Sequence, residues 1–202
     1  METDAWITAD GHVVLDHDGV VRIRARRRPI AEATLSQLPS HIPTLDEYFE
    51  KVGVEHHLSI DVKDDAVTGP MVAVAKEHGF PLDRLWVCHH RHDEVLSIRA
   101  RHGDVRVVDS TRLARIKEGL ESRAARDASA GVDAINMHHT DWNGGSTTLV
   151  HRFDVLAFGW DVQFPHHLET ALAMGLDAVY SDHVDTMVDA YVAHAGSAPT
   201  VG

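Results

Sequence analysis

Short apolar runs alternate with amphipathic stretches along most of the chain. The runs that are typical of β-strands are 57–63, 85–88, 105–109, 134–137, 154–158 and 177–180, and they follow a hairpin at the N-terminus. Helical patterns lie between them, over about 44–52, 70–78, 91–102, 112–127, 144–153, 165–174 and 182–194. Strands that alternate with helices predict parallel βαβ units, and therefore an α/β fold.

The first eighteen residues predict a hairpin around Asp10-Gly11. Asp-Gly between two runs of strand formers favours a two-residue type I′ turn, because both central positions need positive φ. Counting back along both arms then places Asp4 opposite His17. Glu2 and Asp4 are two residues apart, so both carboxylates share one face of the strand. The hairpin is thus expected to gather two carboxylates and an imidazole.

Seven strands, including the first, favour a TIM (β/α)8-type barrel over a doubly wound sheet, because the first turn carries no glycine-rich phosphate loop. A barrel of eight βα units usually takes about 250 residues, and a chain of 202 residues is expected to miss the first unit. We predict one domain over 1–195, a loop in the arginine-rich stretch 20–32, and a loose tail over 196–202.

Composition narrows the function classes. The net charge of −12 argues against a nucleic-acid surface, since phosphate backbones are bound by clustered Lys and Arg. Cys88 is the single cysteine, which fits a reducing compartment. No apolar run reaches the roughly 20 residues of a membrane helix, and no signal peptide precedes the first strand. We therefore expect a cytoplasmic protein with no membrane span.

Polar residues in the strand 57–63 are the next candidates for chemistry. Asp61 and Lys63 alternate with apolar residues, so in a barrel they point inward near the carboxyl end of the strand. Glu2 and Asp4, on the neighbouring strand, would lie beside Asp61 and form a rim of three carboxylates. Oxygen ligands of this kind suit Mg²⁺ or Ca²⁺. The alternative is a frayed edge strand beside a surface ion pair.

The ordered motifs resemble those of the glycerophosphodiester phosphodiesterase family. The opening block ETDAWITADGHVVLDHD is similar to the family's E-x-D-x-x-x-T-x-D-G-x-x-V-x-x-H-D. Further matches in the same order are Ile42 to Glu47 (IPTLDE), Ile60 to Lys63 (IDVK), Ala157 to Trp160 (AFGW) and Gly175 to Asp182 (GLDAVYSD). The resemblance covers essentially the whole chain.

The resemblance implies a (β/α)8 barrel with one divalent metal, Mg²⁺ or Ca²⁺. It also implies an enzyme of lipid and glycerol metabolism that hydrolyses small glycerophosphodiesters to an alcohol and glycerol 3-phosphate. Carried over by position, the metal ligands would be Glu2, Asp4 and Asp61, the catalytic histidine His17, and the substrate-binding residues Lys63 and Trp160.

Two departures from the family pattern bear on activity. Asp61 stands where the family has the longer Glu, so we expect it to reach a metal only through water. The family's opening H-R-G strand has no counterpart after Met1, and we expect its catalytic histidine to be missing. His89 or His139, just beyond two predicted strands, could approach the rim in its place.

Several alternatives follow. The chain could be a non-catalytic barrel that binds a divalent metal or a phosphorylated ligand. It could complete its barrel by pairing the open sheet edge with a partner or as a homo-oligomer. A sphingomyelinase D-like phosphodiesterase is similar in fold and metal chemistry. The arginine cluster from Arg22 to Arg28 predicts either a solvated loop or a site for an anionic headgroup.

Overall fold

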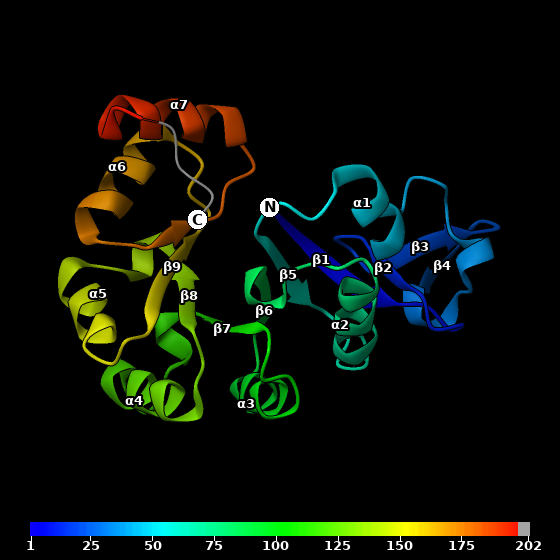
Figure 1. Cartoon of the computed structure of the whole chain (residues 1–202), viewed down its shortest axis with the longest axis horizontal. Coiled ribbons are helices and arrows are strands. Elements are labelled where there is room, and N and C mark those ends of the chain that lie inside the picture. The colour runs from blue at the N-terminus through cyan, green and yellow to red at the C-terminus, as the bar shows by residue number, and fades with distance from the viewer. Residues whose placement is uncertain (198–202) are drawn as a thin grey trace. The chain divides into compact units, whose positions relative to one another are not determined.

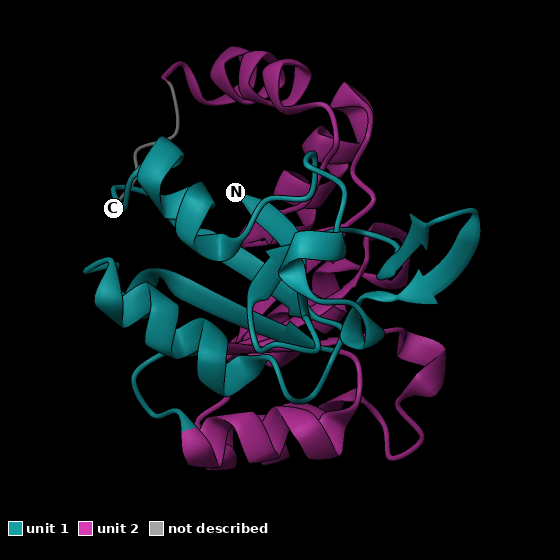
Figure 2. Cartoon of the chain, turned by 90° about the vertical axis from the view of Figure 1, so that its right-hand side faces the viewer, with its two compact units in different colours: residues 1–89, 102–106 teal, residues 90–101, 107–202 magenta. Residues whose placement is uncertain are grey.

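The computed structural model describes residues 1–197, which form two compact units. Unit 1 comprises residues 1–89 and 102–106, and unit 2 comprises residues 90–101 and the chain from residue 107 on (Figure 2). All but two residues of the tail predicted over 196–202 lie outside the described part. A single domain over 1–195 stays a prediction.

Unit 1 has one mixed sheet, with strand order β2-β1-β5-β6, and a separate two-stranded hairpin, β3-β4 (Figure 1). Strands β1, β5 and β6 are parallel, whereas β2 pairs with β1 in the antiparallel direction. The elements are β1 Glu2–Ile7, β2 Val13–Leu15, β3 Val20–Ile23, β4 Arg26–Pro29, α1 Leu45–Val52, β5 Leu58–Val62, α2 Thr68–Glu77 and β6 Leu85–His89. Short 3-10 turns occupy Ile30–Glu32, Leu35–Gln37 and Leu82–Arg84.

Unit 2 repeats the strand–helix alternation, with parallel strands in the order β7-β8-β9-β10. The elements are α3 His92–Arg101, β7 Arg106–Thr111, α4 Leu120–Ala130, β8 Ala134–His138, α5 Gly144–His151, β9 Leu156–Trp160, α6 Pro165–Met174, β10 Ala178–Val179 and α7 Val184–Ala195. Two 3-10 turns occupy Leu113–Arg115 and His139–Asp141. Within the described residues, no helix combines the length and the apolar character needed to cross a membrane.

Burial follows the sequence pattern where the pattern is clearest. Leu58, Ile60 and Val62 of β5 are fully buried, and their polar neighbours face the other side of the strand. The predicted helix start at Thr44 is also confirmed. Its hydroxyl accepts a hydrogen bond from the backbone N–H of Glu47, and the Glu47 carboxylate accepts one from Thr44 in return.

The predicted register of the first hairpin is wrong by one residue. Ile7 pairs with Val13 and Ala5 with Leu15. The loop has three residues, because the N–H of Gly11 bonds back to the carbonyl of Thr8 and Gly11 adopts a φ of +87°. A type I turn followed by a left-handed glycine also favours the sequence Asp-Gly, but its loop is one residue longer than that of a type I′ turn. Asp4 therefore lies opposite Asp16 rather than His17.

The loop predicted over 20–32 is also wrong, because β3 and β4 form a hairpin there. Its turn is made by Arg24 and Ala25, whose φ angles are 47° and 67°. Both values are in the left-handed region that glycine or asparagine usually occupies in such turns. Without those residues the sequence carries no turn signal at this point.

Other boundaries shift by a few residues, and one by eight. The helix predicted from 112 begins at Leu120, because Gly119 takes a φ of +87° at its N-cap and a 3-10 turn precedes it. The strand predicted over 154–158 runs from Leu156 to Trp160. These differences do not change the order of the elements.

Candidate functional site

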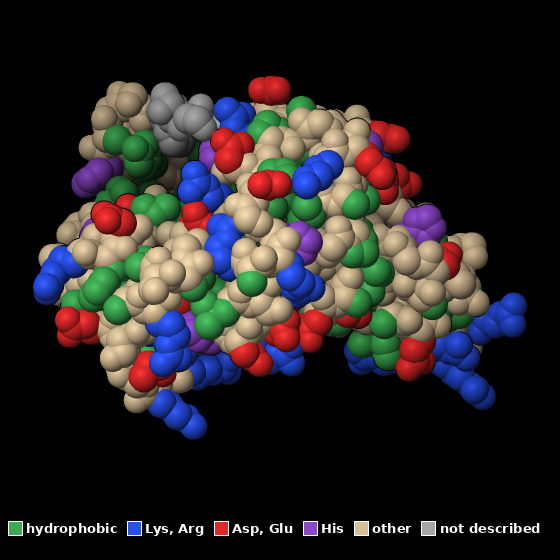
Figure 3. Space-filling model, turned by 60° about the horizontal axis from the view of Figure 1, so that its bottom comes forward, with side chains coloured by type: hydrophobic (Ala, Val, Ile, Leu, Met, Phe, Trp, Pro, Cys, Tyr) green, Lys and Arg blue, Asp and Glu red, His purple; other side chains and the backbone are tan. Residues whose placement is uncertain are grey.

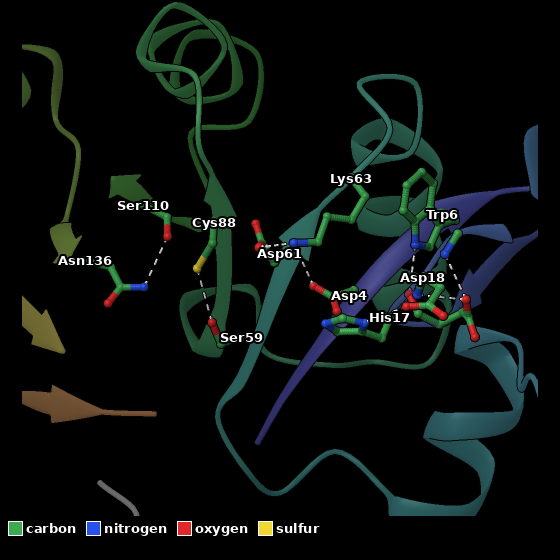
Figure 4. Close-up of polar contacts among 12 residues, drawn as sticks. Asp4, Trp6, His17, Asp18, Ser59, Asp61, Lys63, Cys88, Ser110 and Asn136 are labelled. Carbon is green, nitrogen blue, oxygen red and sulfur yellow. Dashed lines mark hydrogen bonds and ion pairs between the residues drawn. The ribbon is translucent and has the colours of Figure 1, made fainter. Parts of the chain in front are cut away.

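Asp4 and Asp61 lie side by side on neighbouring parallel strands. The register of β1 and β5 pairs Asp4 directly with Asp61, and Lys63 follows β5 by one residue (Figure 4). The Lys63 ammonium lies between the two carboxylates, with Nζ 3.1 Å from Asp4 Oδ1 and 2.5 Å from Asp61 Oδ2. The sequence prediction that the polar face of 57–63 meets Asp4 is therefore confirmed.

The electrostatics of this group reflect partial burial. The side chains of Asp4, Asp61 and Lys63 are 12%, 27% and 31% exposed. Desolvation is the largest effect on Asp4 and raises its pKa, although Lys63 and His17 act in the opposite direction. The pKa of Lys63 is also raised, because the hydrogen bonds and charges of Asp61 and Asp4 outweigh the lowering by burial. The ammonium is therefore charged at neutral pH and holds the two acids together.

Glu2 lies on β1 two residues before Asp4. It is in register with Ser59 and not with Asp61. Two residues of β-strand span about 7 Å. Within residues 1–197, two groups of three His, Cys, Asp or Glu residues bring their donor atoms within 4.8 Å of one another, and neither contains Glu2, Asp4 or Asp61. The structure thus pairs two of the three predicted metal ligands closely.

The donor chemistry of Glu2, Asp4 and Asp61 fits a hard divalent cation. All three offer carboxylate oxygens, which Mg²⁺ and Ca²⁺ prefer. Asp61 Oδ1 is buried and has no hydrogen-bond partner, although its other oxygen bonds to Lys63. A buried oxygen left without a partner costs free energy unless a cation or donor approaches it. These residues can therefore hold a metal with Asp61 Oδ1 as a ready ligand.

The loop that carries His17 is fixed by Asp16. Asp16 Oδ2 accepts the backbone N–H groups of Asp18 and Gly19, at 3.1 and 2.9 Å. The indole of Trp6 donates to the Asp16 carbonyl at 2.8 Å (Figure 4). Gly19 has a φ of +64°, and a Cβ there would lie 2.2 Å from the Trp6 ring. Only glycine fits, so the sequence D-H-D-G locks the loop onto β1.

His17 itself is exposed and paired with its neighbour. Its side chain is 90% exposed, and Nδ1 lies 2.9 Å from Asp18 Oδ1. The bond to Asp18, followed by the charge of Asp4, raises the pKa of His17. Although the register prediction failed, the imidazole remains close enough to Asp4 for each group to shift the other's pKa.

His89, suggested by the sequence as a substitute histidine, ends β6 next to Cys88, which is the register partner of Asp61. Its side chain is 2% exposed, and Nε2 lies 3.2 Å from Asp65 Oδ1. This buried imidazole therefore links the end of β6 to the segment between β5 and α2. Direct access to a substrate would require it to move.

Trp160, predicted to bind substrate, belongs to unit 2 and ends β9. Its indole packs edge-on against the His138 ring at a centroid distance of 4.6 Å. The Arg112 guanidinium lies 5.5 Å from the indole centroid. Arg112 is itself held by two hydrogen bonds to Asp141, at 2.6 and 3.2 Å. The indole of Trp160 is thus in contact with the His138 imidazole and the Arg112 guanidinium.

Sequence reasoning missed two polar features of unit 2, a buried amide and a second set of residues that contains two histidines and a carboxylate. The first is Asn136 in β8, whose side chain is almost fully buried and whose Oδ1 has no hydrogen-bond partner. Its signal was an amide within the otherwise apolar run AINM. The second joins His138 and His139 with Asp161, whose φ is +64°. His139, the other proposed substitute histidine, lies in this second set.

The electrostatics of this second set favour a neutral His139 beside an ionised Asp161. Burial, followed by the neighbouring histidines His167 and His138, lowers the pKa of His139. The hydrogen bond from His138 lowers the pKa of Asp161. At neutral pH the set therefore offers uncharged ring nitrogen and an ionised carboxylate.

A buried ionic cluster joins α3, β7 and α4 within unit 2. Asp109 and Asp127 are fully buried, and Arg123 Nη1 lies 2.7 Å from Asp109 Oδ2. His92 Nε2 lies 2.7 Å from Asp127 Oδ1. Burial, followed by the charge of Asp109, raises the pKa of Asp127 to about 6. Because a guanidinium already faces Asp109, we interpret this cluster as structural.

The raised pKa of Asp127 predicts a pH-dependent stability. A carboxyl whose pKa is higher in the folded state binds more protons there than in the unfolded chain. The free energy of unfolding should therefore fall as pH rises from about 4 to about 6. A rise from 3.8 to about 6 corresponds to about 3 kcal/mol. In urea titrations across this range, Asp127→Asn should flatten the slope, whereas the exposed control Asp93→Asn should keep it. An unchanged slope in Asp127→Asn would contradict the assignment.

The arginine-rich hairpin lines a surface cavity of about 690 Å³. Its basic wall consists of Arg22, Arg24, Arg26 and Arg28, and the chain at 36–39 closes the other side. On the face drawn in Figure 3, basic side chains elsewhere are interspersed with acidic ones. The hairpin is thus a local concentration of positive charge on an acidic protein.

No family model matches the sequence, and no curated protein matches it either. Solved structures do match. A protein from Agrobacterium tumefaciens, assigned provisionally as a glycerophosphoryl diester phosphodiesterase, is 15% identical with a TM-score of 0.84, over 97% of this chain and 86% of that one. An Oleispira antarctica phosphodiesterase, solved with the product sn-glycerol-3-phosphate, is 18% identical with a TM-score of 0.80, over 94% and 83%. A Parabacteroides distasonis glycerophosphodiester phosphodiesterase is 18% identical with a TM-score of 0.71, over 96% and 84%.

These likenesses show the fold. The chain has the α/β architecture of the glycerophosphodiester phosphodiesterase structures, which confirms the TIM-barrel fold class predicted from the strand pattern and agrees with the resemblance of the motifs. Identities of 15–18% leave the residue roles to be argued from the geometry of the site.

Proposed function

We propose that this chain hydrolyses glycerophosphodiesters to an alcohol and glycerol 3-phosphate, with a divalent metal held by Glu2, Asp4 and Asp61. One observation carries the proposal. On two parallel strands of a phosphodiesterase fold, Asp4 and Asp61 are paired in register with Lys63 between them, and Asp61 Oδ1 is buried without a partner. Barrel enzymes place their reactive groups at the carboxyl ends of such strands.

Each side chain has a role that its surroundings favour. Lys63 is charged and flexible, so its ammonium can leave the carboxylates and bind a phosphoryl oxygen. His17 is exposed, and its raised pKa suits a general acid that protonates the leaving alcohol. The hydrogen bonds of Asp16 to Asp18 and Gly19 fix the backbone of the loop that carries this imidazole. A metal held by the three carboxylates would neutralise charge on the phosphoryl oxygens.

The direct test is release of glycerol 3-phosphate from glycerophosphocholine, with Mg²⁺ or Ca²⁺ and after chelation with EDTA. We expect turnover that is lost on chelation and restored by metal. Asp4→Asn keeps the shape of the side chain but removes its charge, and should lower kcat/KM by at least about 10²-fold. Glu50 is an exposed carboxylate on α1, and Glu50→Gln is the matched control, with turnover like the wild type.

The outcomes separate the parts of the proposal. Turnover that resists chelation would remove the metal from the proposal, and turnover that is unaffected by Asp4→Asn would remove the role of the carboxylates. No release of product at any metal concentration would contradict hydrolysis of this substrate class.

A second candidate is a barrel that binds a phosphorylated ligand without hydrolysing it. The favouring observation is that Lys63 already forms ion pairs with both Asp4 and Asp61, and so competes with a metal for their carboxylates. Calorimetric binding of glycerol 3-phosphate without turnover, weakened by Lys63→Met, would support this candidate. Turnover of glycerophosphocholine would exclude it.

A further inference from the structure

We propose that His138, His139 and Asp161 form a binding site for Zn²⁺ at the carboxyl ends of β8 and β9. The three side chains each offer one ligand atom, and these atoms lie within 4.8 Å of one another. The site uses none of the carboxylates of β1 and β5, so it goes beyond the function proposed above.

The strands bring the three residues together. His138 ends β8 and pairs in register with Trp160, which ends β9, and Asp161 follows directly. His138 Nε2 lies 3.0 Å from Asp161 Oδ2. Zinc bonds of 2.0–2.2 Å to nitrogen and oxygen in a tetrahedral arrangement leave those two ligand atoms about 3.4 Å apart. A shift of a few tenths of an ångström therefore admits the metal in place of the shared proton.

Neighbouring groups already orient two of the ligands. Thr140 contacts His138 Nδ1 through its hydroxyl, at 2.7 Å, and through its backbone N–H, at 3.3 Å. The backbone N–H donates to Nδ1. When a metal replaces the proton on Nε2, the ring proton moves to Nδ1, where the Thr140 hydroxyl oxygen can accept it and the longer backbone hydrogen bond is given up. On the other side, the Gln163 amide donates to Asp161 Oδ1 at 3.3 Å. Such outer contacts fix ligand orientation in protein metal sites.

A fourth imidazole, that of His167, packs on one of the three ligands. The His167 ring packs on His139 at a centroid distance of 4.3 Å, and its Nδ1 is buried without a hydrogen-bond partner. A buried ring nitrogen without a partner needs an explanation. A movement of the ring toward a metal on His139 would supply one and would give the site a fourth ligand, as in structural zinc sites.

The ligand chemistry selects the metal. Imidazole nitrogen with one carboxylate suits Zn²⁺ and the later transition metals, whereas Mg²⁺ and Ca²⁺ favour oxygen ligands. Glu2, Asp4 and Asp61 offer only oxygen. The two sets of residues should therefore discriminate between the two classes of cation.

The test is calorimetric titration of the metal-free full chain with Zn²⁺, with circular dichroism melts to check that each variant is folded. We expect saturable binding of one tight Zn²⁺ per chain. His139→Ala and Asp161→Asn should each weaken it by at least about 100-fold, and Gln163→Ala by about 10–100-fold. Asp161→Asn also preserves the backbone, because asparagine tolerates the φ of +64°.

Two control variants separate this site from a general affinity for metal. His151 and Asp177 form a comparable pair, with Nε2 and Oδ2 2.8 Å apart, and no third donor joins them among the described groups. His151→Ala should leave tight Zn²⁺ binding unchanged, and so should Asp4→Asn, whether or not the chain hydrolyses a diester. The proposal is overturned if the wild type shows no saturable binding, if His139→Ala binds like the wild type, or if either control loses the tight site.

Discussion

Replacing His17 with glutamine is expected to lower kcat for glycerophosphocholine hydrolysis by about 10²–10⁴-fold, with a much smaller change in KM. A positioned acid or base contributes a factor of this size to the rate. The ring is 90% exposed and open to solvent, and its loop is locked by Asp16 independently of the imidazole. The variant should therefore fold as the wild type does. His12 is an exposed histidine on the same hairpin, and His12→Gln should retain full activity.

The pH profile makes this prediction specific to His17. As a general acid, His17 must be protonated, so kcat should fall as pH rises through its raised pKa. Asp18 is the largest cause of that shift, because its carboxylate stabilises the protonated ring. Asp18→Asn should therefore move the basic limb to lower pH and leave the rate at acid pH nearly unchanged. An unmoved limb, or full activity in His17→Gln, would assign the proton to another group.

The fold was predictable because the order of strands and helices follows from hydrophobic period alone. The pairing of Asp4 with Asp61 was predictable for the same reason, since alternation along two neighbouring parallel strands places both on one face. The hairpin register was not predictable. An Asp-Gly pair serves two-residue and three-residue loops alike, and the glycine has a positive φ in both. The two loops differ at Asp10, which a type I′ turn would hold at positive φ and which does not adopt one here.

The histidine cluster of unit 2 could not be predicted because its members come from two separate stretches of sequence, 138–139 and 161. His138 and His139 are adjacent in sequence, which on a strand would point them to opposite faces. The strand ends at His138, and the 3-10 turn that begins at His139 brings the two rings into contact at 4.7 Å. Asp161 joins them through the register of β8 and β9. If the strand continued through His139, the two rings would point to opposite faces of the sheet and could not share a ligand.

Arg123→Met is expected to destabilise the protein by about 3–5 kcal/mol, the largest effect on stability that we predict. Arg123 is 9% exposed and donates to Asp109, which is fully buried, and to Glu118 at 2.8 Å. Without the guanidinium, Asp109 must either stay charged and unpaired in the interior or take up a proton. Burial already raises its pKa. The loss should therefore be larger at pH 8 than at pH 5 in urea unfolding.

A double variant distinguishes the buried charge from lost packing. Asp109→Asn together with Arg123→Met removes both charges and should recover most of the stability lost in the single variant, because no uncompensated charge remains. Arg126 is the matched control, since it lies on the same helix and faces the same Glu118 at 3.8 Å but is 56% exposed. Arg126→Met should change stability by less than about 0.5 kcal/mol. If the double variant were as unstable as Arg123→Met, the arginine would stabilise the protein through its packing and not through its ion pair with Asp109. In that case the stability lost in Arg123→Met would not depend on pH.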